Sequence, residues 1–462
     1  MKYTITFVAL LVTQIVLGQG NIQGIDSLLN NLYKKGRING NVLIAEKGEI
    51  TYNKSFGFAN EKTQEKLNKN SIFDLASVTK QFTATGIVIL KEHGKLKYDD
   101  PISKYIPELS FYQGVTIKHL LQHTGGLPDY MDLLEASFDK NKVATNEDII
   151  KYFLQKKPKI LFEPSKDWRY SNTGYALLAS IIERASGLKY SKFLSKHIFT
   201  PLKMKSTFVQ TIKFLPHKIT NLAYSYKYSD NLKKLVLTDD LKEFNHVKMF
   251  AGIVGDGGVF STAMDLLKWN TALRTGKLIS LNEKKEMFTP AMLSDTSTFD
   301  YGFGWQLDSS DVFGKVVSHT GGWAGYLTLN ELHIDNDKTI IILFNHEGAE
   351  IVNKTIRYAL YGLPEPNPTG KKEITLTSEQ LNKVIGVYKI QEGLEFFITL
   401  NSGYLYASMT NQTPLRIYPD SETSYFFKEF NATILFKMNE IGNVDKLIFS
   451  QGEHKMEGKK IK

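Results

Sequence analysis

The sequence predicts an α+β domain, an antiparallel sheet flanked by helices with an inserted all-helical lobe, followed by an all-β barrel or sandwich. Three observations support this fold class. Short β-branched and aromatic segments occur near residues 41–58 and again over 302–345, with mostly helical patterns between them. A proline-rich stretch then interrupts the chain. Beyond it, strand-like segments recur at roughly regular spacing. The predicted domains are a signal peptide over residues 1–20, the α+β domain over 21–362, a linker over 363–370 and the β domain over 371–462.

Composition narrows the classes of protein. The 462 residues are 42% hydrophobic, which is enough for packed cores in two or three domains. Cysteine is absent, so disulfides, thiolate catalysis, thiolate zinc sites and a lipidated N-terminal cysteine are excluded. The formal net charge is +9, but lysines are spread along the whole sequence. We therefore expect a solvated basic surface and no nucleic-acid partner.

The N-terminus has the pattern of a secretory signal peptide. Lys2 provides a charged start, a mostly apolar run extends from Ile5 to Leu17, and small residues follow at Gly18 and Gly20. The run is short for a membrane span, and an uncleaved anchor is the alternative. We expect a periplasmic or extracellular protein, with no stable membrane insertion after cleavage.

Periodicity over the first half of the α+β domain predicts one hairpin and several helices. A short amphipathic helix spans residues 25–35, and two strands over 41–58 flank a turn at Lys47-Gly48. A long helix begins near Ser77 and stops at Gly94. Short elements over 96–107 and 115–121 precede a turn-rich loop at 123–129. Two further helices span 147–154 and 170–187, the latter with capping residues at 171–173.

The second half returns to strands. Residues 206–250 are mixed and polar, and a glycine-rich turn at Gly257-Gly258 leads into a helix capped by Ser261 or Thr262. Strands are predicted over 302–307, 315–318, 326–334 and 338–345, and a helix over 351–361. Because strands lie at both ends of this unit, one antiparallel sheet is expected from both. The β domain contributes seven predicted strands, over 384–390, 395–400, 404–409, 415–419, 424–427, 432–438 and 446–450.

The Ser77-Val-Thr-Lys80 segment is the first candidate for chemistry. On a helix the two side chains lie one turn apart on the same side. A serine hydroxyl becomes a nucleophile when a neighbour removes its proton, and a lysine that is kept neutral can do this. The helix N-terminus adds N–H groups and positive partial charge, which favour a developing oxyanion.

The Ser-x-x-Lys spacing is weak by itself, because Ser137…Lys140 and Ser186…Lys189 match it too. Context separates the three pairs. Ser186 immediately precedes Gly187, where a helix should end, and Ser137 lies in a polar segment. Ser77 alone stands at the start of a long apolar helix.

Two other segments could complete a serine acyl-transfer site. Tyr170-Ser-Asn172 is the only Tyr-x-Asn in the sequence, and such a tyrosine can act as a general base while the amide holds a substrate carbonyl. The alternatives are an ordinary buried tyrosine and a helix cap. His319-Thr-Gly-Gly322 follows the apolar Val316-Val317, so a strand could aim N–H groups and a donor or cationic side chain into a groove. The second His-Thr-Gly-Gly, at His123, has no preceding strand and is interpreted as a structural loop.

Taken together, these motifs resemble those of the serine β-lactamase-like hydrolases of the class C type, a group that includes D,D-peptidases, D-aminopeptidases and carboxylesterases. The three motifs occur in that family's order, and the segments at 120–128 and 257–265 are also similar to recurrent family segments. The resemblance covers roughly residues 25–362, and the C-terminal part loosely resembles the β-rich domains that follow such hydrolases.

The resemblance implies a role for each motif. Ser77 would be acylated, and Lys80 and Tyr170 would move its proton and protonate the leaving group. Asn172, His319, Gly321 and Gly322 would contact substrate, with the N–H groups of Ser77 and Gly322 forming the oxyanion hole. No metal or cofactor is implied. The Gly-x-Ser-x-Gly of α/β-hydrolases is absent.

One departure from the family bears on the substrate. The best-known members carry lysine where His319 stands, and that lysine pairs with the carboxylate of β-lactams. Histidine is mostly neutral near pH 7. We therefore expect a secreted serine hydrolase acting on a small-molecule or peptide ester, amide or D-amino-acid bond, with β-lactamase or D,D-carboxypeptidase as the alternative. A non-catalytic penicillin-binding-like sensor or scaffold is the competing class. A further hypothesis, compatible with catalysis, is that the β domain binds cell-wall glycan or a partner protein.

Overall fold

The computed structural model describes residues 21–461, except 211–218, 230–233, 242–244, 348–351, 365–368, 392, 402, 411–413, 429–430 and 453. The predicted signal peptide, residues 1–20, and residues 365–368 of the predicted linker lie outside the described residues. Contacts divide the chain into two compact units, Ile22–Asn353 and one that includes Lys354–Lys462. The division falls at the start of α11 (Asn353–Leu360).

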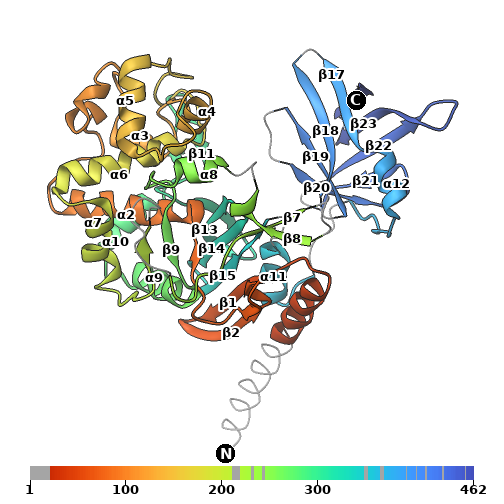
Figure 1. Ribbon diagram of the computed structural model, residues 1–462, viewed down its shortest axis with the longest axis horizontal. Helices are drawn as coiled ribbons and strands as arrows, with labels where there is room; N and C mark the ends of the chain where they lie inside the picture. Colours follow the sequence, from red (N-terminus) through yellow and green to blue (C-terminus); the bar gives the residue numbers. More distant parts are fainter. Residues whose placement is uncertain are drawn as a thin grey trace, which may run out of the picture. The chain divides into compact units, whose positions relative to one another are not determined.

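The first unit is built on the predicted antiparallel sheet. Its six strands run in the order β12-β13-β14-β15-β1-β2. Their bounds are β1 (Gly40–Glu46), β2 (Glu49–Phe56), β12 (Gln306–Ser310), β13 (Gly314–Trp323), β14 (Tyr326–His333) and β15 (Lys338–Phe344). Val42 of β1 pairs with Ile342 of β15, so segments from both ends of the unit lie side by side, as Figure 1 shows by their red and blue-green colours. The prediction of one sheet from both ends is confirmed.

The helix that follows Ser77 is more deeply buried than its apolar stripe indicates. A 3₁₀ turn (Ala76–Val78) leads into α2 (Thr79–Glu92), and every residue from Thr79 to Leu90 is buried. Gly86 allows this close packing, because a Cβ there would lie 2.8 Å from Ile182 Cδ1 of α6 (Asn172–Ser186). One turn earlier, Phe82 packs on Trp269 of α9 (Ala263–Thr275), with ring centroids 4.5 Å apart. The helix is therefore part of the hydrophobic core of the unit.

A helical lobe is inserted between the strands of the sheet, as predicted. Besides α6 it contains α3 (Ile117–Leu121), α4 (Tyr130–Glu135), α5 (Asn146–Lys156), α7 (Tyr190–Leu194), two 3₁₀ turns (Ile102–Lys104, Pro107–Leu109) and a π turn (Ser195–Phe199). Ser171 caps α6 by accepting the N–H of Gly174, and Gly187 ends it with φ +74°. Residues 22–34 are helical, α10 spans Leu281–Met287, and α8 spans Asn245–Phe250.

Short strands complete the unit, and some differ from the prediction. They are β3 (Phe58–Asn60), β4 (Glu65–Lys66), β5 (Phe73–Asp74), β6 (Phe208–Val209), β7 (Tyr226–Ser229), β8 (Lys234–Leu237), β9 (Val259–Ser261), β10 (Ala291–Met292), β11 (Thr298–Phe299) and β16 (His346–Glu347). The strand predicted over 302–307 begins only at Gln306. A Cβ at Gly304 would lie 2.6 Å from Lys80 O, so this segment packs closely against α2 instead of extending the sheet.

The second unit contains a closed barrel, so the prediction of a barrel or sandwich resolves to a barrel. Its eight strands are β17 (Gly386–Gln391), β18 (Leu394–Asn401), β19 (Tyr404–Met409), β20 (Leu415–Pro419), β21 (Ser424–Phe426), β22 (Ala432–Met438), β23 (Val444–Gln451) and β24 (His454–Lys460). The last strand was not predicted, because His-Lys-Met-Glu-Gly-Lys-Lys is mostly polar. It pairs with both β23 and β17 and closes the barrel. A short helix, α12 (Ser378–Lys383), was also not predicted.

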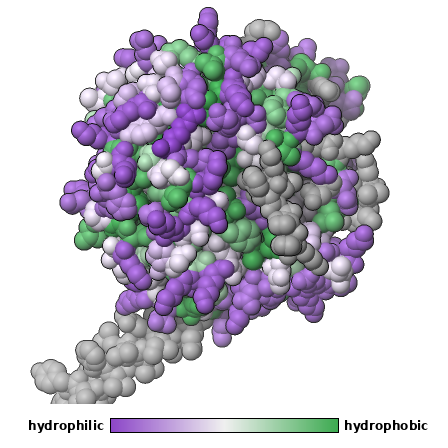
Figure 2. Space-filling model, turned by 60° about the vertical axis from the view of Figure 1, so that its left-hand side comes forward, coloured by the Kyte–Doolittle hydropathy of each residue, from purple (hydrophilic) through white to green (hydrophobic). Residues whose placement is uncertain are grey.

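Figure 2 shows one face on which hydrophilic residues predominate and hydrophobic ones are scattered in small groups. Among the described residues, none of the helices combines the length and the apolar character that a bilayer crossing requires.

Candidate active site

Ser77 lies on a strained turn between β5 and α2. The preceding residue, Ala76, has φ +47°, a left-handed conformation that costs a residue with a side chain about 1–2 kcal/mol. Two side chains hold the turn. Asp74 Oδ1 accepts the N–H of Ala76 at 2.8 Å, and the Thr328 hydroxyl of β14 donates to Leu75 O at 2.8 Å. Ser77 itself remains half-buried, whereas its neighbours are buried.

Lys80 is fully buried, one turn beyond Ser77. Its Nζ lies 3.1 Å from Ser77 Oγ, 2.9 Å from Asn172 Oδ1 and 3.0 Å from the main-chain oxygen of Asp256. The last two atoms can only accept hydrogen bonds. They therefore take two hydrogens of the amine and direct its remaining position at the Ser77 hydroxyl.

Asn172 contacts Lys80 because it is not the helix cap. Ser171 caps α6, so the alternative interpretation of Asn172 as a helix cap is wrong. The Asp129 carboxylate accepts both the main-chain N–H of Asn172, at 2.9 Å, and its side-chain Nδ2, at 3.1 Å. With its NH₂ group bound to Asp129, the amide turns its oxygen toward Lys80.

Tyr170 adjoins this group through its ring. Lys80 Nζ lies 4.8 Å from the centroid of the Tyr170 ring, within the range of a cation–π contact when the amine is charged. The ring is half-buried and also packs on His123 and His319, with centroid distances of 4.5 and 6.1 Å. Ser77, Lys80 and Asn172 are thus joined by hydrogen bonds, and Tyr170 stands beside them.

His319 is buried and is not a cation. Its Nδ1 lies 2.6 Å from Thr320 O, which can only accept, so the ring hydrogen is on Nδ1 and Nε2 accepts from the Tyr301 hydroxyl at 2.9 Å. Burial, and secondly the charge of Lys80, lower the pKa of His319 to about 3. Both ring nitrogens are engaged, so a cationic side chain, one option that the sequence left open for this strand, is not present at His319.

The two glycines after His319 differ in their surroundings. A Cβ on Gly321 would lie 2.3 Å from Leu75 O and 3.1 Å from Ala76 Cβ, so Gly321 allows β13 to lie against the turn that carries Ser77. Gly322 is exposed, and a Cβ there would meet no atom within 4 Å. The main chain at Gly322 is therefore accessible, and its part in an oxyanion hole stays a prediction.

Several residues of the site were missed from the sequence. Asp129, Asp74 and Asp256 are single acidic residues in loops or short strands, and no spacing marks them. The Tyr130 hydroxyl donates to Asp256 Oδ2 at 2.8 Å, and burial raises the pKa of Asp256. Burial also raises the pKa of Asp74, to about 7.

The other Ser-x-x-Lys pairs do not form comparable sites. Ser137 is exposed and donates to Leu133 O at 2.7 Å. Ser186 donates to Ile182 O at 2.6 Å, and Lys189 lies beyond the end of α6, paired with Glu183. Of the three pairs, Ser77 and Lys80 are the one joined by a hydrogen bond, and the catalytic role of Ser77 stays a prediction.

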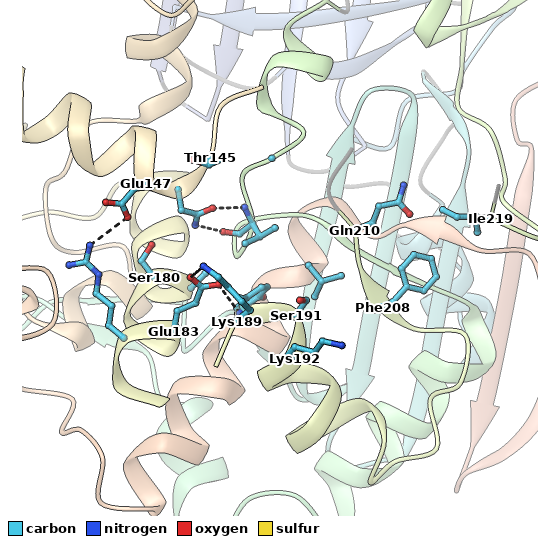
Figure 3. A pocket seen from close by; sticks show the side chains of 17 residues that line it. Thr145, Glu147, Ser180, Glu183, Lys189, Ser191, Lys192, Phe208, Gln210 and Ile219 are labelled. Atoms are coloured by element: carbon cyan, nitrogen blue, oxygen red, sulfur yellow. Dashed lines mark hydrogen bonds and ion pairs between the residues drawn. The ribbon is translucent and has the colours of Figure 1, made fainter. Parts of the chain in front are cut away.

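A large cavity lies away from Ser77. It measures about 690 Å³, and its wall includes residues of α5, α6, α7 and β6, but not Ser77, Lys80 or Tyr170 (Figure 3). Four charged side chains of its wall form two pairs: Lys189 with Glu183 at 3.3 Å, and Arg184 with Glu147 at 3.6 Å. Within the described part of the chain, no group of three or more histidine, aspartate or glutamate side chains is arranged to hold a metal.

Comparison with known proteins agrees with this geometry. Residues 25–362 match the protein-family model described as Beta-lactamase. Penicillin-binding protein 4* of Bacillus subtilis is 38% identical over 441 residues, covering 94% of this chain and 98% of that protein. The octameric penicillin-binding protein homologue from Pyrococcus abyssi superposes with a TM-score of 0.66 at 23% identity, covering 94% of this chain and 99% of that one. The D-amino acid amidase from Ochrobactrum anthropi SV3 superposes with a TM-score of 0.60 at 26% identity, covering 74% and 96%.

Proposed function

The chain belongs to the beta-lactamase family, and on that premise we propose that it is a secreted serine hydrolase acting through an acyl-enzyme. The proposed substrate carries an ester, an amide or a D-amino-acid peptide bond. One observation carries the proposal: the amine of Lys80 lies 3.1 Å from the Ser77 hydroxyl and is held there by two carbonyl oxygens.

That arrangement supports proton removal from Ser77. A neutral amine has two hydrogens, which Asn172 Oδ1 and Asp256 O accept, and its lone pair then faces the Ser77 hydroxyl. In the proposed acylation, Oγ attacks the substrate carbonyl carbon while its proton passes to Lys80. The tetrahedral oxyanion would accept the N–H groups of Ser77 and Gly322.

The second half of the cycle uses the same groups. The proton moves from Lys80, with Tyr170 beside it, to the leaving alcohol or amine as the bond to the carbonyl carbon breaks. Water then gives a proton to Lys80 as it adds to the carbonyl carbon of the acyl-enzyme ester. The bond between this carbon and Ser77 Oγ breaks, Oγ takes the proton from Lys80, and the acid is released. Lys80 Nζ lies 4.8 Å from the centroid of the Tyr170 ring, which supports a shared role of the two side chains in proton transfer.

The chemistry of His319 favours substrates without a carboxylate at that strand. A buried, neutral ring with both nitrogens engaged offers no charge to such a group. This favours esters, amides and D-amino-acid derivatives over β-lactams. The D-amino acid amidase, whose name contains an amide substrate, is a structural neighbour, and the superposition covers 96% of its length.

A second candidate is capture of a β-lactam or D,D-peptide at Ser77. The name of the relative with 38% identity, Penicillin-binding protein 4*, favours it. In its non-catalytic form, a sensor or scaffold, Ser77 would be acylated once without turnover. Export through residues 1–20 belongs to either proposal and rests on the charge and apolar pattern of that segment.

Both candidates are tested with purified protein and its Ser77→Ala variant. The panel is a series of p-nitrophenyl esters, a chromogenic cephalosporin and D-amino-acid amides, together with a fluorophosphonate probe for active serines. We expect turnover of esters or amides and probe uptake by the native chain, and neither by Ser77→Ala. Stoichiometric acylation without turnover supports the sensor. Undiminished turnover by Ser77→Ala contradicts both.

A further inference from the structure

His123 lies in the loop between α3 and α4 and has no part in the proposed chemistry. Its side chain is only 2% exposed, and its φ is +61°, a conformation in which histidine is uncommon. The same His-Thr-Gly-Gly sequence occurs at His319, and both histidines pack against the ring of Tyr170. A buried histidine on strained backbone beside a candidate catalytic residue indicates a specific requirement.

The contacts of His123 bracket Tyr170. Its main-chain oxygen accepts the N–H of Arg169 at 3.0 Å. Its ring Nδ1 lies 3.1 Å from the N–H of Ser171 and accepts it. The imidazole centroid is 4.5 Å from the centroid of the Tyr170 ring, with 40° between the planes. The side chain and the main-chain oxygen of His123 therefore contact all three residues from Arg169 to Ser171.

These contacts require a neutral imidazole. An Nδ1 that accepts a peptide N–H carries no hydrogen, so the ring hydrogen is on Nε2. Burial, followed by the charge of Lys80, keeps the pKa of His123 well below its usual value. The groups packed on the ring are the aromatic side chains of Trp168, Tyr170, Tyr175 and Tyr301, with centroids 4.5 to 5.8 Å away. No carboxylate is among these ring contacts to favour a cation.

We propose that His123 is a positioning residue for Tyr170. By holding the peptide groups on both sides of the tyrosine, it sets the ring over Lys80 and the start of α6, from which Asn172 projects. The inference rests on the proposed function, since it assigns His123 to the acid–base pair of that mechanism. It replaces the interpretation of this loop as structural only.

Two substitutions separate the acceptor from the bulk of the ring. His123→Asn keeps an acceptor near the place of Nδ1 and suits a left-handed backbone. His123→Phe keeps a ring but cannot accept the N–H of Ser171. On the best substrate of the panel, we expect His123→Phe to lower kcat about 10- to 100-fold with KM within about threefold, and His123→Asn to stay within about fivefold of native kcat. Equal losses in both variants, or full activity in His123→Phe, would overturn the proposal.

A double-mutant cycle shows whether the effect passes through Tyr170. If it does, adding His123→Phe to Tyr170→Phe lowers kcat by less than about twofold further, because the positioned group is already gone. Multiplying losses would instead mean that His123 acts elsewhere. Melting temperatures identify any unfolded variant, and His123→Gln, which sets its acceptor one bond further out, then replaces His123→Phe with the same expected loss. If Ser77→Ala is inactive and His123→Phe is fully active, only this inference fails; activity in Ser77→Ala removes the proposed function itself.

Discussion

At the scale of single residues, buried acidic groups surround the turn that carries Ser77. Asp74 accepts the N–H of Ala76, and the main-chain oxygen of Asp256 accepts from Lys80. Burial, and to a lesser extent the charge of Asp256, raises the pKa of Asp74. An acidic group whose pKa is higher in the folded state binds its proton preferentially there. Its contribution to stability is therefore lost as the pH rises from the unfolded value to the folded one.

Asp74→Asn should remove this pH dependence. The amide keeps an oxygen for the N–H of Ala76 and carries no charge. Because the pKa of Asp74 rises from 3.8 to about 7, the native chain loses stability between about pH 4 and 7. We expect Asp74→Asn to melt ~2–8 °C higher than the native chain at pH 8 and within about 1 °C of it at pH 4.

Thermal melting followed by circular dichroism at several pH values measures this difference. Asp295→Asn is the matched control, since the pKa of that exposed carboxyl is lowered, in the opposite direction to that of Asp74. A gap between Asp74→Asn and the native chain that stays constant from pH 4 to 8 would show that Asp74 does not titrate in this range.

At the scale of elements, the site depends on β13 lying against the Ser77 turn. The register places Gly321 opposite Thr328, whose hydroxyl donates to Leu75 O. Gly321 therefore fits against the Leu75 carbonyl oxygen and the Thr328 hydroxyl that donates to it. Any side chain there displaces either the strand or the turn.

Gly321→Ala should disrupt this contact. The new Cβ would lie 2.3 Å from both Leu75 O and Thr328 Oγ1, so β13 must shift. We expect a melting temperature lowered by ~3–8 °C and a loss of kcat of about 100-fold, because a shift near 1 Å misplaces the nucleophile. Gly322→Ala, with no atom within 4 Å of its Cβ, is the control for stability and should melt within about 1 °C of the native chain. Equal melting temperatures for the two variants would contradict the argument.

How far the sequence predicts these elements depends on where their contacts come from. The Lys47-Gly48 hairpin, the Ser77 helix and the 170–187 helix carry their own turn, capping and periodic signals, and the structure confirms them. The predicted start of the strand over 302–307 was wrong because Gly304 packs on the main chain of α2, a contact that no local sequence pattern indicates. Asp129 and Asp256 were missed for the same reason, since their partners lie 43 and 126 residues away.

At the scale of the whole molecule, two compact units each have a hydrophobic core. One core includes Phe82 and Trp269, and the other lines the barrel with Tyr388, Ile434 and Leu447. Closure of the barrel depends on β24, which pairs with β23 and β17. Without it, two strand edges would be exposed to pairing with other chains.

A chain that ends at Gly452 should therefore lose only the barrel. We expect it to aggregate or to lack the barrel's melting transition in calorimetry, while the transition of the unit Ile22–Asn353 stays within about 2 °C. Ile461→Ser, at an exposed position after β24, is the control and should leave both transitions unchanged. If the truncated chain retains a barrel transition and stays monomeric in size-exclusion chromatography, β24 is dispensable for closure.

The hydrogen bond from Thr328 to Leu75 spans 253 residues of sequence. A nascent polypeptide that has just exposed Ser77 and Lys80 outside the ribosome still lacks β13, β14 and β15. The Thr328 hydroxyl therefore cannot yet hold the turn, and no strand pairs with the free side of β1. The contacts around Ser77 are consequently completed late, after almost the whole unit has been translated. If Ser77 is the nucleophile that we propose, incomplete translation products lack hydrolytic activity, and the reactive serine first exists where folding is completed.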